Sequence, residues 1–326
     1  MLVARVLRTI EAHALLDPGA RVLVAISGGA DSLALLHALR SIAGDLGLVL
    51  TGATVDHGLR PESADEHAKV ASYVRSTGVP CEVLGLSLGA GNAIQERARD
   101  ARYEALLRHA SEEGCDAVAV AHTRDDQAET VLARLLRGAG VRGLAGALRR
   151  RDDRVVRPML DVSRAEILAY LGDLGLTPLV DDPSNRDDRF LRSRVRHGLL
   201  PTLAAEQPEI ASMLARLADD AREHREMVEG LADELEPLAS PSLAVLARAR
   251  PPLRRELLRR WGVRQGLAPL GRVHLEALER LCLTARGEAR LPGAFVVAIE
   301  NGRLALRPIH DPRPSPPTQS DSVEEA

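Results

Sequence analysis

A six-residue segment, Ser27-Gly28-Gly29-Ala30-Asp31-Ser32, carries the strongest chemical signal in the chain. Residues 22–26 before it are apolar, with β-branched side chains at alternate positions, which predicts a buried parallel strand. Leucines at helical spacing follow the segment, so we expect a helix to begin beside the two glycines. Free backbone N–H groups and the helix dipole both favour an anion at such a turn. Residues 27–32 are therefore predicted to bind phosphate.

Asp31 is the residue of this segment that indicates a cation. A carboxylate repels a neighbouring phosphate unless a divalent ion lies between them, so we expect Mg²⁺ with Asp31 as a ligand. The segment lacks the lysine of the Walker pattern and the G-x-G-x-x-G spacing of the dinucleotide fingerprint. The alternative is an ordinary strand–helix turn whose glycines serve close packing alone.

The first half of the chain alternates strand and helix signals. Apolar runs occupy residues 48–55, 81–86 and 117–121, and helical patterns occupy residues 62–76 and 92–113. This alternation predicts an α/β fold, with a parallel, Rossmann-like sheet covered by helices on both faces. Ligands of such sheets bind beyond the carboxyl ends of the strands. The segments Ser27–Ser32, Asp56-His57 and His122–Asp126 each follow a predicted strand, which supports one active site at that edge.

The second half of the chain is predicted to form a smaller helical domain. Beyond about residue 199 the pattern of apolar residues is helical. The one exception is a short hairpin predicted at Ala294–Ile299 and Gly302–Leu306. A tail rich in Pro, Ser and acidic residues predicts disorder. We therefore expect a catalytic domain at residues 1–200, a mainly helical domain at 201–308 and a disordered tail at 309–326.

Composition excludes several classes of protein. The chain has 326 residues, and no apolar run approaches the roughly 18 residues that a membrane span needs. The N-terminus reads as an amphipathic helix and not as a signal peptide. The cysteines Cys81, Cys115 and Cys282 are widely separated, which argues against disulfides and a zinc site. These features predict a cytoplasmic protein without a membrane partner.

Arginine carries almost all of the positive charge, since Lys69 is the one lysine among 43 basic residues. Five arginines lie at residues 186–196, and seven lie at residues 248–264, where Glu256 is the one acid. Arginine suits bidentate contact with phosphate, so both clusters predict a nucleic-acid surface. A GC-rich genome would explain the choice of arginine over lysine, but not seven arginines against one acid.

The six-residue segment resembles the pyrophosphate (PP) loop of the N-type ATP pyrophosphatases. Further motifs follow it in order: Asp56-His57-Gly58-Leu59-Arg60, Asn92-Ala93-Ile94-Gln95, His122-Thr123-Arg124-Asp125-Asp126, Leu136-Arg137-Gly138-Ala139-Gly140, Arg157-Pro158, Asp181-Asp182-Pro183-Ser184-Asn185 and Arg192-Ser193-Arg194. Together they make residues 20–200 similar to the tRNA(Ile)-lysidine synthetases, and the helical remainder is similar in type and length. Two positions depart from that pattern, because Thr123 stands where a second His is common and Ser193 where Asn is usual.

The resemblance implies a two-step reaction on the wobble cytidine of a CAU-anticodon isoleucine tRNA. ATP first adenylylates the C2 oxygen of that base with release of pyrophosphate, and the ε-amine of free lysine then displaces AMP to form lysidine. ATP is then a substrate and Mg²⁺ the cofactor. The expected partners are tRNA(Ile) and free lysine, and a homodimer stays open.

The residue chemistry and the resemblance together suggest a role for each candidate. The residues expected to bind ATP are Ser27, Gly28, Gly29, Ala30, Asp31, Ser32, His57 and His122. The residues expected to act in catalysis are Asp31, Asp125, Asp126, Arg192 and Arg194. The residues expected to bind tRNA are Arg99, Arg102, Arg137, Arg142, Arg196, Arg254, Arg255 and Arg259.

Several of these assignments have a structural alternative. Asp125 and Asp126 suit metal ligation or deprotonation of the lysine ammonium, but they also suit a helix N-terminus. The lone histidines could equally be structural. The glycine-rich segment 137–144 suggests a flexible flap over the site, and a plain surface loop is the alternative.

Two arginine groups have predicted orientations. Gln95, Arg99 and Arg102 share one helix face, which points either to the substrate or to solvent. Arg192, Arg194 and Arg196 alternate along the chain, so in an extended segment they would point the same way; Arg192 or Arg194 would then reach the target base or the developing adenylate charge.

Three rival functions fit parts of the same pattern. A tRNA thiolase needs a persulfide cysteine or an iron–sulfur cluster, and no cysteine lies beside these motifs. GMP- or NAD-forming ligases share the loop but lack the later arginine-rich run. A non-catalytic, ATP-responsive RNA-binding protein would use the same surfaces without chemistry.

Overall fold

The computed structural model describes residues 1–56, 58, 63–86, 94–180, 191–235 and 242–309. His57, the turn at Asp181–Asn185 and most of the predicted tail therefore lie outside the described residues. The chain forms two compact units, Met1–Arg222 and Glu223–Ala326, and each is described by itself.

The first unit is built on a five-stranded sheet in the order β3-β2-β1-β4-β5. Its strands are β1 (Arg21–Ala25), β2 (Val49–Asp56), β3 (Cys81–Gly85), β4 (Ala117–Ala119) and β5 (Val155–Val156). Every neighbouring pair is parallel, which confirms the predicted α/β fold.

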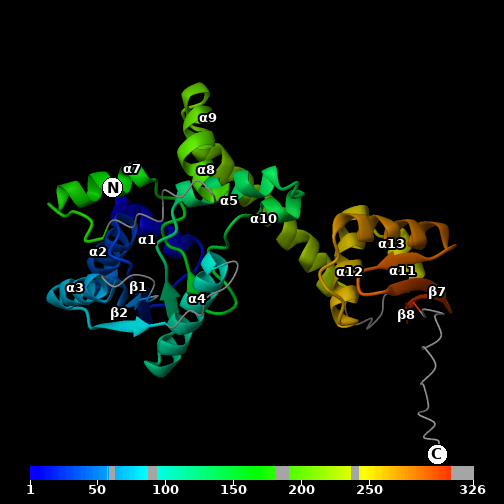
Figure 1. Ribbon diagram of the computed structural model, residues 1–326, viewed down its shortest axis with the longest axis horizontal. Coiled ribbons are helices and arrows are strands. Elements are labelled where there is room, and N and C mark those ends of the chain that lie inside the picture. The colour runs from blue at the N-terminus through cyan, green and yellow to red at the C-terminus, as the bar shows by residue number, and fades with distance from the viewer. Residues whose placement is uncertain (57, 59–62, 87–93, 181–190, 236–241, 310–326) are drawn as a thin grey trace, which may run out of the picture. The chain divides into compact units, whose positions relative to one another are not determined.

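Alternating side chains of β1 bury both faces of this sheet. Val22 and Val24 belong to one buried cluster, and Leu23 belongs to another on the opposite face, because successive side chains of a strand point to opposite faces. Figure 1 shows helices on both sides of the strands. The first cluster is covered by α1 (Leu2–Ala12), α2 (Ala30–Leu46), α3 (Ser63–Ser76) and α7 (Arg164–Asp173), and the second by α4 (Ile94–Glu112).

The strand order creates a crevice between β1 and β4. From β1 the chain moves outward through β2 and β3, and α4 then returns it to β4 on the other side of β1. The loops that follow β1 and β4 therefore leave the sheet in opposite directions at its carboxyl edge. Such a switch point is where ligands bind in parallel sheets.

A helical layer follows in the first unit. Its elements are α5 (Arg124–Leu136), α6 (Val141–Leu144), α8 (Leu191–Arg194), a π-helical turn (Val195–Leu199), α9 (Leu200–Glu206) and the start of α10 (Ile210–Glu234). Val131 of α5, Val195 and Ala218 of α10 share one buried cluster. The first compact unit extends to Arg222, because the first turns of α10 pack into this cluster.

Two sequence predictions are wrong in this layer. The glycine-rich segment 137–144 contains the helical turn α6, and Arg134 holds it by donating to the carbonyl oxygens of Gly143 at 2.9 Å and Gly146 at 3.0 Å. The segment is therefore not a loop throughout. The second error concerns residues 192–196, which are helical and not extended. The helical backbone buries the side chain of Val195 in the cluster that it shares with α5 and α10.

The second unit has a helical part and a small sheet. Its elements after α10 are α11 (Leu243–Arg248), α12 (Pro251–Arg264), α13 (Arg272–Thr284), β6 (Ala289–Leu291), β7 (Phe295–Glu300) and β8 (Arg303–Pro308). Strands β7 and β8 confirm the predicted hairpin, and Asn301 and Gly302 both take the positive φ that a tight hairpin turn requires. Strand β6, which pairs with β7, was not predicted. In the described part of the chain, no helix combines the length and apolar character of a membrane span.

Candidate active site

The loop after β1 has a backbone that excludes side chains at Gly28. The φ of Gly28 is +81°, a conformation that costs non-glycine residues energy. A Cβ atom there would lie 2.6 Å from Cγ2 of Val70 and 2.9 Å from Cγ2 of Val180. The carbonyl oxygen of Gly28 accepts hydrogen bonds from the backbone of Leu179 and Val180. The second glycine, Gly29, is the N-cap of α2.

The two serines of the loop hold its shape. Ser32 donates from Oγ to the carbonyl oxygen of Gly29 at 2.9 Å and accepts from the backbone of Ser27 at 3.2 Å. Because no side chain caps α2, the first N–H groups of this 17-residue helix face the loop without a side-chain partner. The predicted phosphate cradle of residues 27–32, including Ala30 as the first helical residue, thus has the geometry that an anion requires.

Asp31 lies in the first turn of α2, and its side chain is 29% exposed. Burial raises the pKa of Asp31 to about 6, and the positive charge of Arg164 opposes that shift. The guanidinium of Arg164 lies 3.2 Å from Oδ2 of Asp31. The charges of Asp126, Arg196 and Asp125 also act on the pKa of Asp31. The loops that follow β1 and β4 therefore lie close together.

The loop after β4 ends in a capped helix. Thr123 is the N-cap of α5, where its hydroxyl accepts from the backbone N–H of Asp126, and the Asp126 carboxylate accepts from the backbone of Thr123 at 3.0 Å. The hydroxyl of Thr123 therefore forms one half of a capping box, and the carboxylate of Asp126 forms the other half. The alternative interpretation of the Asp pair, a helix N-terminus, is confirmed for Asp126.

Asp126 is also an ion-pair partner. Its Oδ1 accepts from Arg192 at 2.7 Å and from Arg196 at 2.9 Å. Burial alone would raise the pKa of Asp126, but Arg192, the backbone N–H of Thr123 and Arg196 together hold the pKa below its usual value. Asp126 is thus a carboxylate that stays ionised, and a saturated acceptor of this kind is a poor proton acceptor.

Glu129 completes the cluster and was missed in the sequence. Its side chain is 3% exposed, and it accepts from Arg192 at 2.9 Å and from Arg196 at 3.0 Å. Arg192 and Arg196 reach the same two carboxylates because helical residues four apart share a face. Arg194 is exposed, so the expectation that all three arginines point the same way is wrong. The overlooked signal was the spacing of Asp126 and Glu129 on one helix face.

A hydrogen-bonded chain lies beside this cluster. Arg157, which follows β5, donates to Nδ1 of His122 at 3.3 Å and to the hydroxyl of Tyr103 at 3.3 Å. Burial lowers the pKa of His122 to about 3, so its imidazole is neutral at physiological pH. Sequence analysis had placed His122 at the site but had given Arg157 no role beyond its motif.

Arg99 and Arg102 lie on α4, with their guanidinium carbons 5.7 Å and 5.8 Å from the centre of the Tyr103 ring. Arg99 is exposed and Arg102 is half-buried. Both guanidinium groups of the predicted helix face thus lie near the ring of Tyr103. The side chain of Gln95 lies outside the described part of the helix.

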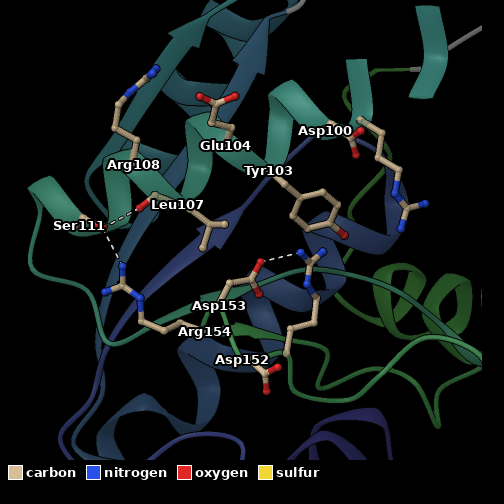
Figure 2. A pocket seen from close by; sticks show the side chains of 11 residues that line it. Asp100, Tyr103, Glu104, Leu107, Arg108, Ser111, Asp152, Asp153 and Arg154 are labelled. Atoms are coloured by element: carbon tan, nitrogen blue, oxygen red, sulfur yellow. Dashed lines mark hydrogen bonds and ion pairs between the residues drawn. The ribbon is translucent and has the colours of Figure 1, made fainter. Parts of the chain in front are cut away.

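A cavity of about 800 Å³ opens beside Arg99. Figure 2 shows Tyr103 pointing from α4 towards the turn that carries Asp152, Asp153 and Arg154. Four arginines and four acids line the cavity, so it has no net attraction for a polyanion. The lining of this cavity therefore does not favour a phosphate group.

The arginines predicted to bind tRNA fall into two groups. Arg137 and Arg142 are exposed in the first unit. In the second unit Arg255 pairs with Glu279 at 2.7 Å, and Arg259 pairs with Glu256 at 3.4 Å. The arginines at residues 248–264 therefore pair with more acidic residues than the nearby sequence contains, because Glu279 belongs to another helix, α13.

Arg254 is a correction to the predicted tRNA-binding set. It is 6% exposed and donates to the carbonyl oxygens of Leu246 at 2.7 Å and Ala249 at 2.6 Å. These carbonyls belong to the end of α11, whose last groups need such donors. A buried guanidinium held in this way has no access to phosphate, so Arg254 has a structural role.

The residues present fit a magnesium ion that is shared with a nucleotide. Among the described residues there is no group of three His, Cys, Asp or Glu side chains that could hold a metal alone. Mg²⁺ is commonly bound by one or two carboxylates together with substrate phosphates. Asp31, in the first turn of α2, would be one such carboxylate.

The cysteines lie away from this site. Cys81 begins β3 and Cys115 precedes β4, so both are at the amino edge of the sheet, opposite the candidate site. Cys282 is on α13 in the second unit. All three are buried and free.

Comparison with known proteins agrees with the fold and the loop. A PP-loop domain model matches residues 3–203, and a TilS substrate binding domain model matches residues 242–304. The U34-tRNA thiolase NcsA from Methanococcus maripaludis superposes with a TM-score of 0.58 at 20% identity, covering 68% of this chain and 78% of its own. The fold, the loop and the domain match define a PP-loop protein.

The sequence relatives are more specific. The tRNA(Ile)-lysidine synthase of Salinispora tropica is 42% identical and covers 93% of this chain and 95% of its own length. The enzyme of the same name from Thermobifida fusca is 41% identical and covers 88% and 92%. The chain belongs to the tRNA(Ile)-lysidine synthase family, which confirms the resemblance carried by the motifs.

Proposed function

We propose that this protein joins lysine to C2 of the wobble cytidine of a CAU-anticodon tRNA(Ile), using ATP and passing through an adenylylated tRNA. The observation that carries the proposal is the meeting of two groups across the switch point. The phosphate cradle after β1 lies beside the arginine–carboxylate cluster of Asp126, Glu129, Arg192 and Arg196 after β4. A phosphate site alone would explain ATP binding, whereas the second cluster adds two guanidinium groups, held by Asp126 and Glu129, that can donate hydrogen bonds to a reacting base.

In the first step the cradle holds the β,γ-pyrophosphate while the C2 oxygen of cytidine attacks the α-phosphorus. The bond from the α-phosphorus to the bridging oxygen breaks, and pyrophosphate leaves with the electron pair. The backbone of Gly28 and Gly29, the hydroxyls of Ser27 and Ser32 and the N-terminus of α2 hold the leaving group. Arg192 and Arg196 stabilise negative charge that develops on the adenylate.

A magnesium ion bound by Asp31 and the phosphates would neutralise charge on the leaving pyrophosphate. Asp31 holds that position because it lies in the first turn of α2, one residue beyond Ala30. No other carboxylate of the described chain lies in this turn.

In the second step the ε-amine of lysine attacks C2 and AMP leaves. The ammonium must first lose a proton, and we assign this role to Asp125. Asp126 is saturated by Thr123, Arg192 and Arg196, whereas Asp125 uses Oδ2 for the backbone N–H of Arg164 at 2.8 Å. Among the described residues the structure gives Oδ1 of Asp125 no partner, so this oxygen can accept the proton.

Arginines of both units supply the tRNA surface in this proposal. Arg137 and Arg142 are exposed in the first unit, and Arg255 and Arg259 are half-buried on α12 in the second. We assign catalysis to the part of the chain up to residue 200 and tRNA binding mainly to residues 201–308. A homodimer is the oligomeric state to test by sedimentation.

The test is nucleoside analysis of tRNA(Ile) after incubation with purified protein, ATP and labelled lysine. We expect label in a modified cytidine, pyrophosphate release that depends on CAU-anticodon tRNA and AMP release that depends on lysine. A folded protein that binds ATP and tRNA but releases neither product would leave the non-catalytic RNA-binding function. Thiolation is disfavoured because Cys81 and Cys115 lie at the opposite edge of the sheet.

A further inference from the structure

The guanidinium of Arg164 lies against the carboxylate of Asp31. Its Nη1 lies 3.2 Å from Oδ2 and 3.4 Å from Oδ1 of Asp31. Arg164 comes from α7, which is 133 residues further along the chain, so this ion pair joins α7 to the phosphate loop. Among the charged groups that act on the Asp31 carboxylate, Arg164 has the largest effect.

The backbone of Arg164 is held by α5, whereas its side chain is largely exposed. Ser163 caps α7 through a capping box with Glu166, and the backbone N–H of Arg164 donates to Oδ2 of Asp125 at 2.8 Å. The start of α7 is therefore tied to the first turn of α5. The side chain of Arg164 is 55% exposed, and an exposed ion pair is weak enough to exchange partners.

We propose that Arg164 is a counter-ion that exchanges partners: it neutralises Asp31 in the nucleotide-free protein and turns to the outer phosphates of ATP when Asp31 takes up a divalent cation. This inference rests on the proposed function, because it assumes that ATP binds at the loop after β1.

The charges at the site require such an exchange. The carboxylates of Asp31, Asp125, Asp126 and Glu129 gather at this site, and the neighbouring Arg192 and Arg196 are held by Asp126 and Glu129. A metal-free Asp31 beside incoming phosphate would therefore meet like charge without Arg164. Once a divalent cation binds Asp31, the guanidinium is repelled from it, and the nearest anion of matching geometry is phosphate.

The proposal predicts two changes of opposite sign in Arg164→Gln. Without the competing guanidinium, Asp31 should bind Mn²⁺ about threefold more tightly in the absence of nucleotide, which electron paramagnetic resonance measures. Without the guanidinium as a phosphate ligand, pyrophosphate should bind about tenfold more weakly in the presence of saturating Mg²⁺, which calorimetry measures. A purely structural Arg164 would weaken both.

Two variants serve as controls. Arg164→Lys keeps the charge, so it should leave Mn²⁺ affinity unchanged and restore most of the pyrophosphate affinity. Arg40→Gln removes an exposed arginine from the same helix as Asp31, and it should change neither measurement. Thermal melting of each variant establishes that it is folded.

The outcomes separate the two proposals. If the unaltered protein binds neither pyrophosphate nor Mn²⁺, the assignment of an ATP site at this loop fails. If it binds both, but Arg164→Gln changes the two affinities in the same direction or leaves them unchanged, the partner exchange is overturned and the proposed function stands.

Discussion

Arg157 donates a hydrogen bond from Nε to Nδ1 of His122, 3.3 Å away, and so joins the carboxyl ends of the adjacent strands β4 and β5. A ring nitrogen that accepts from a guanidinium carries no proton, so the neutral His122 keeps its proton on Nε2. Burial of the ring lowers its pKa to about 3. His122 can therefore donate a hydrogen bond to a substrate but does not serve as a base.

We predict that His122 does not titrate in the folded protein between about pH 5 and pH 8. Its ring nitrogen shifts, followed by NMR in selectively labelled protein, should stay constant over this range. The unfolded state takes up the proton near pH 6.5 while the folded state does not, so His122 lowers the free energy of unfolding as the pH falls below that value.

The control is the same protein in denaturant, where every histidine should titrate normally. A folded-state titration of His122 near its ordinary pKa would show that the ring is solvated, and the contact with Arg157 would then not fix its tautomer.

Asp31→Asn should stabilise the nucleotide-free protein and abolish pyrophosphate release. The folded state binds the Asp31 proton more tightly than the unfolded state does, with a pKa of about 6 against 3.8. The free energy of unfolding therefore falls as pH rises between these two values. At neutral pH the variant should gain about 1–2 kcal/mol, measured by urea denaturation.

The pH dependence supplies the check. Below the unfolded pKa of 3.8, Asp31 is protonated in both states, so the difference between variant and parent should vanish there. A variant that is less stable at neutral pH would mean that the ion pair with Arg164 outweighs the cost of burying the carboxylate.

Gly28→Ala should destabilise the protein by about 2–4 kcal/mol and eliminate ATP binding. The added methyl group meets both strain and collision, because φ is +81° and Val70 lies 2.6 Å from the new atom. Chemical denaturation measures the first effect and equilibrium dialysis with ATP the second. Gly78→Ala is the matched control, since its φ is +85° with nothing within 4 Å, and it should cost about 1 kcal/mol and leave ATP binding unchanged. Equal losses in the two variants would show that close packing at Gly28 is unimportant.

The sequence predicted the parts of this site that depend on local patterning. The strand before Ser27, the glycine turn and the helix after it are close neighbours in the chain, so their arrangement follows from periodicity and turn chemistry. The placement of His122 at the same edge followed from the alternation of strands and helices.

The pairs that complete the site are formed by residues far apart in the chain. Arg164 is 133 residues from Asp31, and Arg192 is 63 residues from Glu129. The backbone near residue 195 became helical because Val195 is buried against α5, which local alternation of arginines does not reveal. Charge counts failed at Arg254 for the same reason, since its partners are the carbonyl groups of α11 and Glu279 of α13, none of them next to it in the sequence.

Glu129→Ala should destabilise the first unit by about 3 kcal/mol, because it removes the more deeply buried of the two carboxylates that pair with Arg192 and Arg196. A double-mutant cycle with Arg196→Ala measures the coupling, which should exceed about 1 kcal/mol. The pair Arg307–Glu300 on the surface of the second unit is the comparison, and its coupling should lie below that value. Equal coupling energies for both pairs would mean that burial does not strengthen the interaction of Glu129 with Arg196.

Arg137→Ala and Arg254→Ala should separate tRNA binding from folding. Arg137 is exposed, so its loss should weaken tRNA binding and reduce the slope of log affinity against log salt by about one. Arg254 holds two carbonyl groups at the end of α11, so its loss should cost about 2 kcal/mol of stability in the second unit. Its salt slope should match that of the parent at temperatures where the variant is folded. If Arg254→Ala lowers the slope as Arg137→Ala does, the side chain reaches phosphate after all and its structural assignment is wrong.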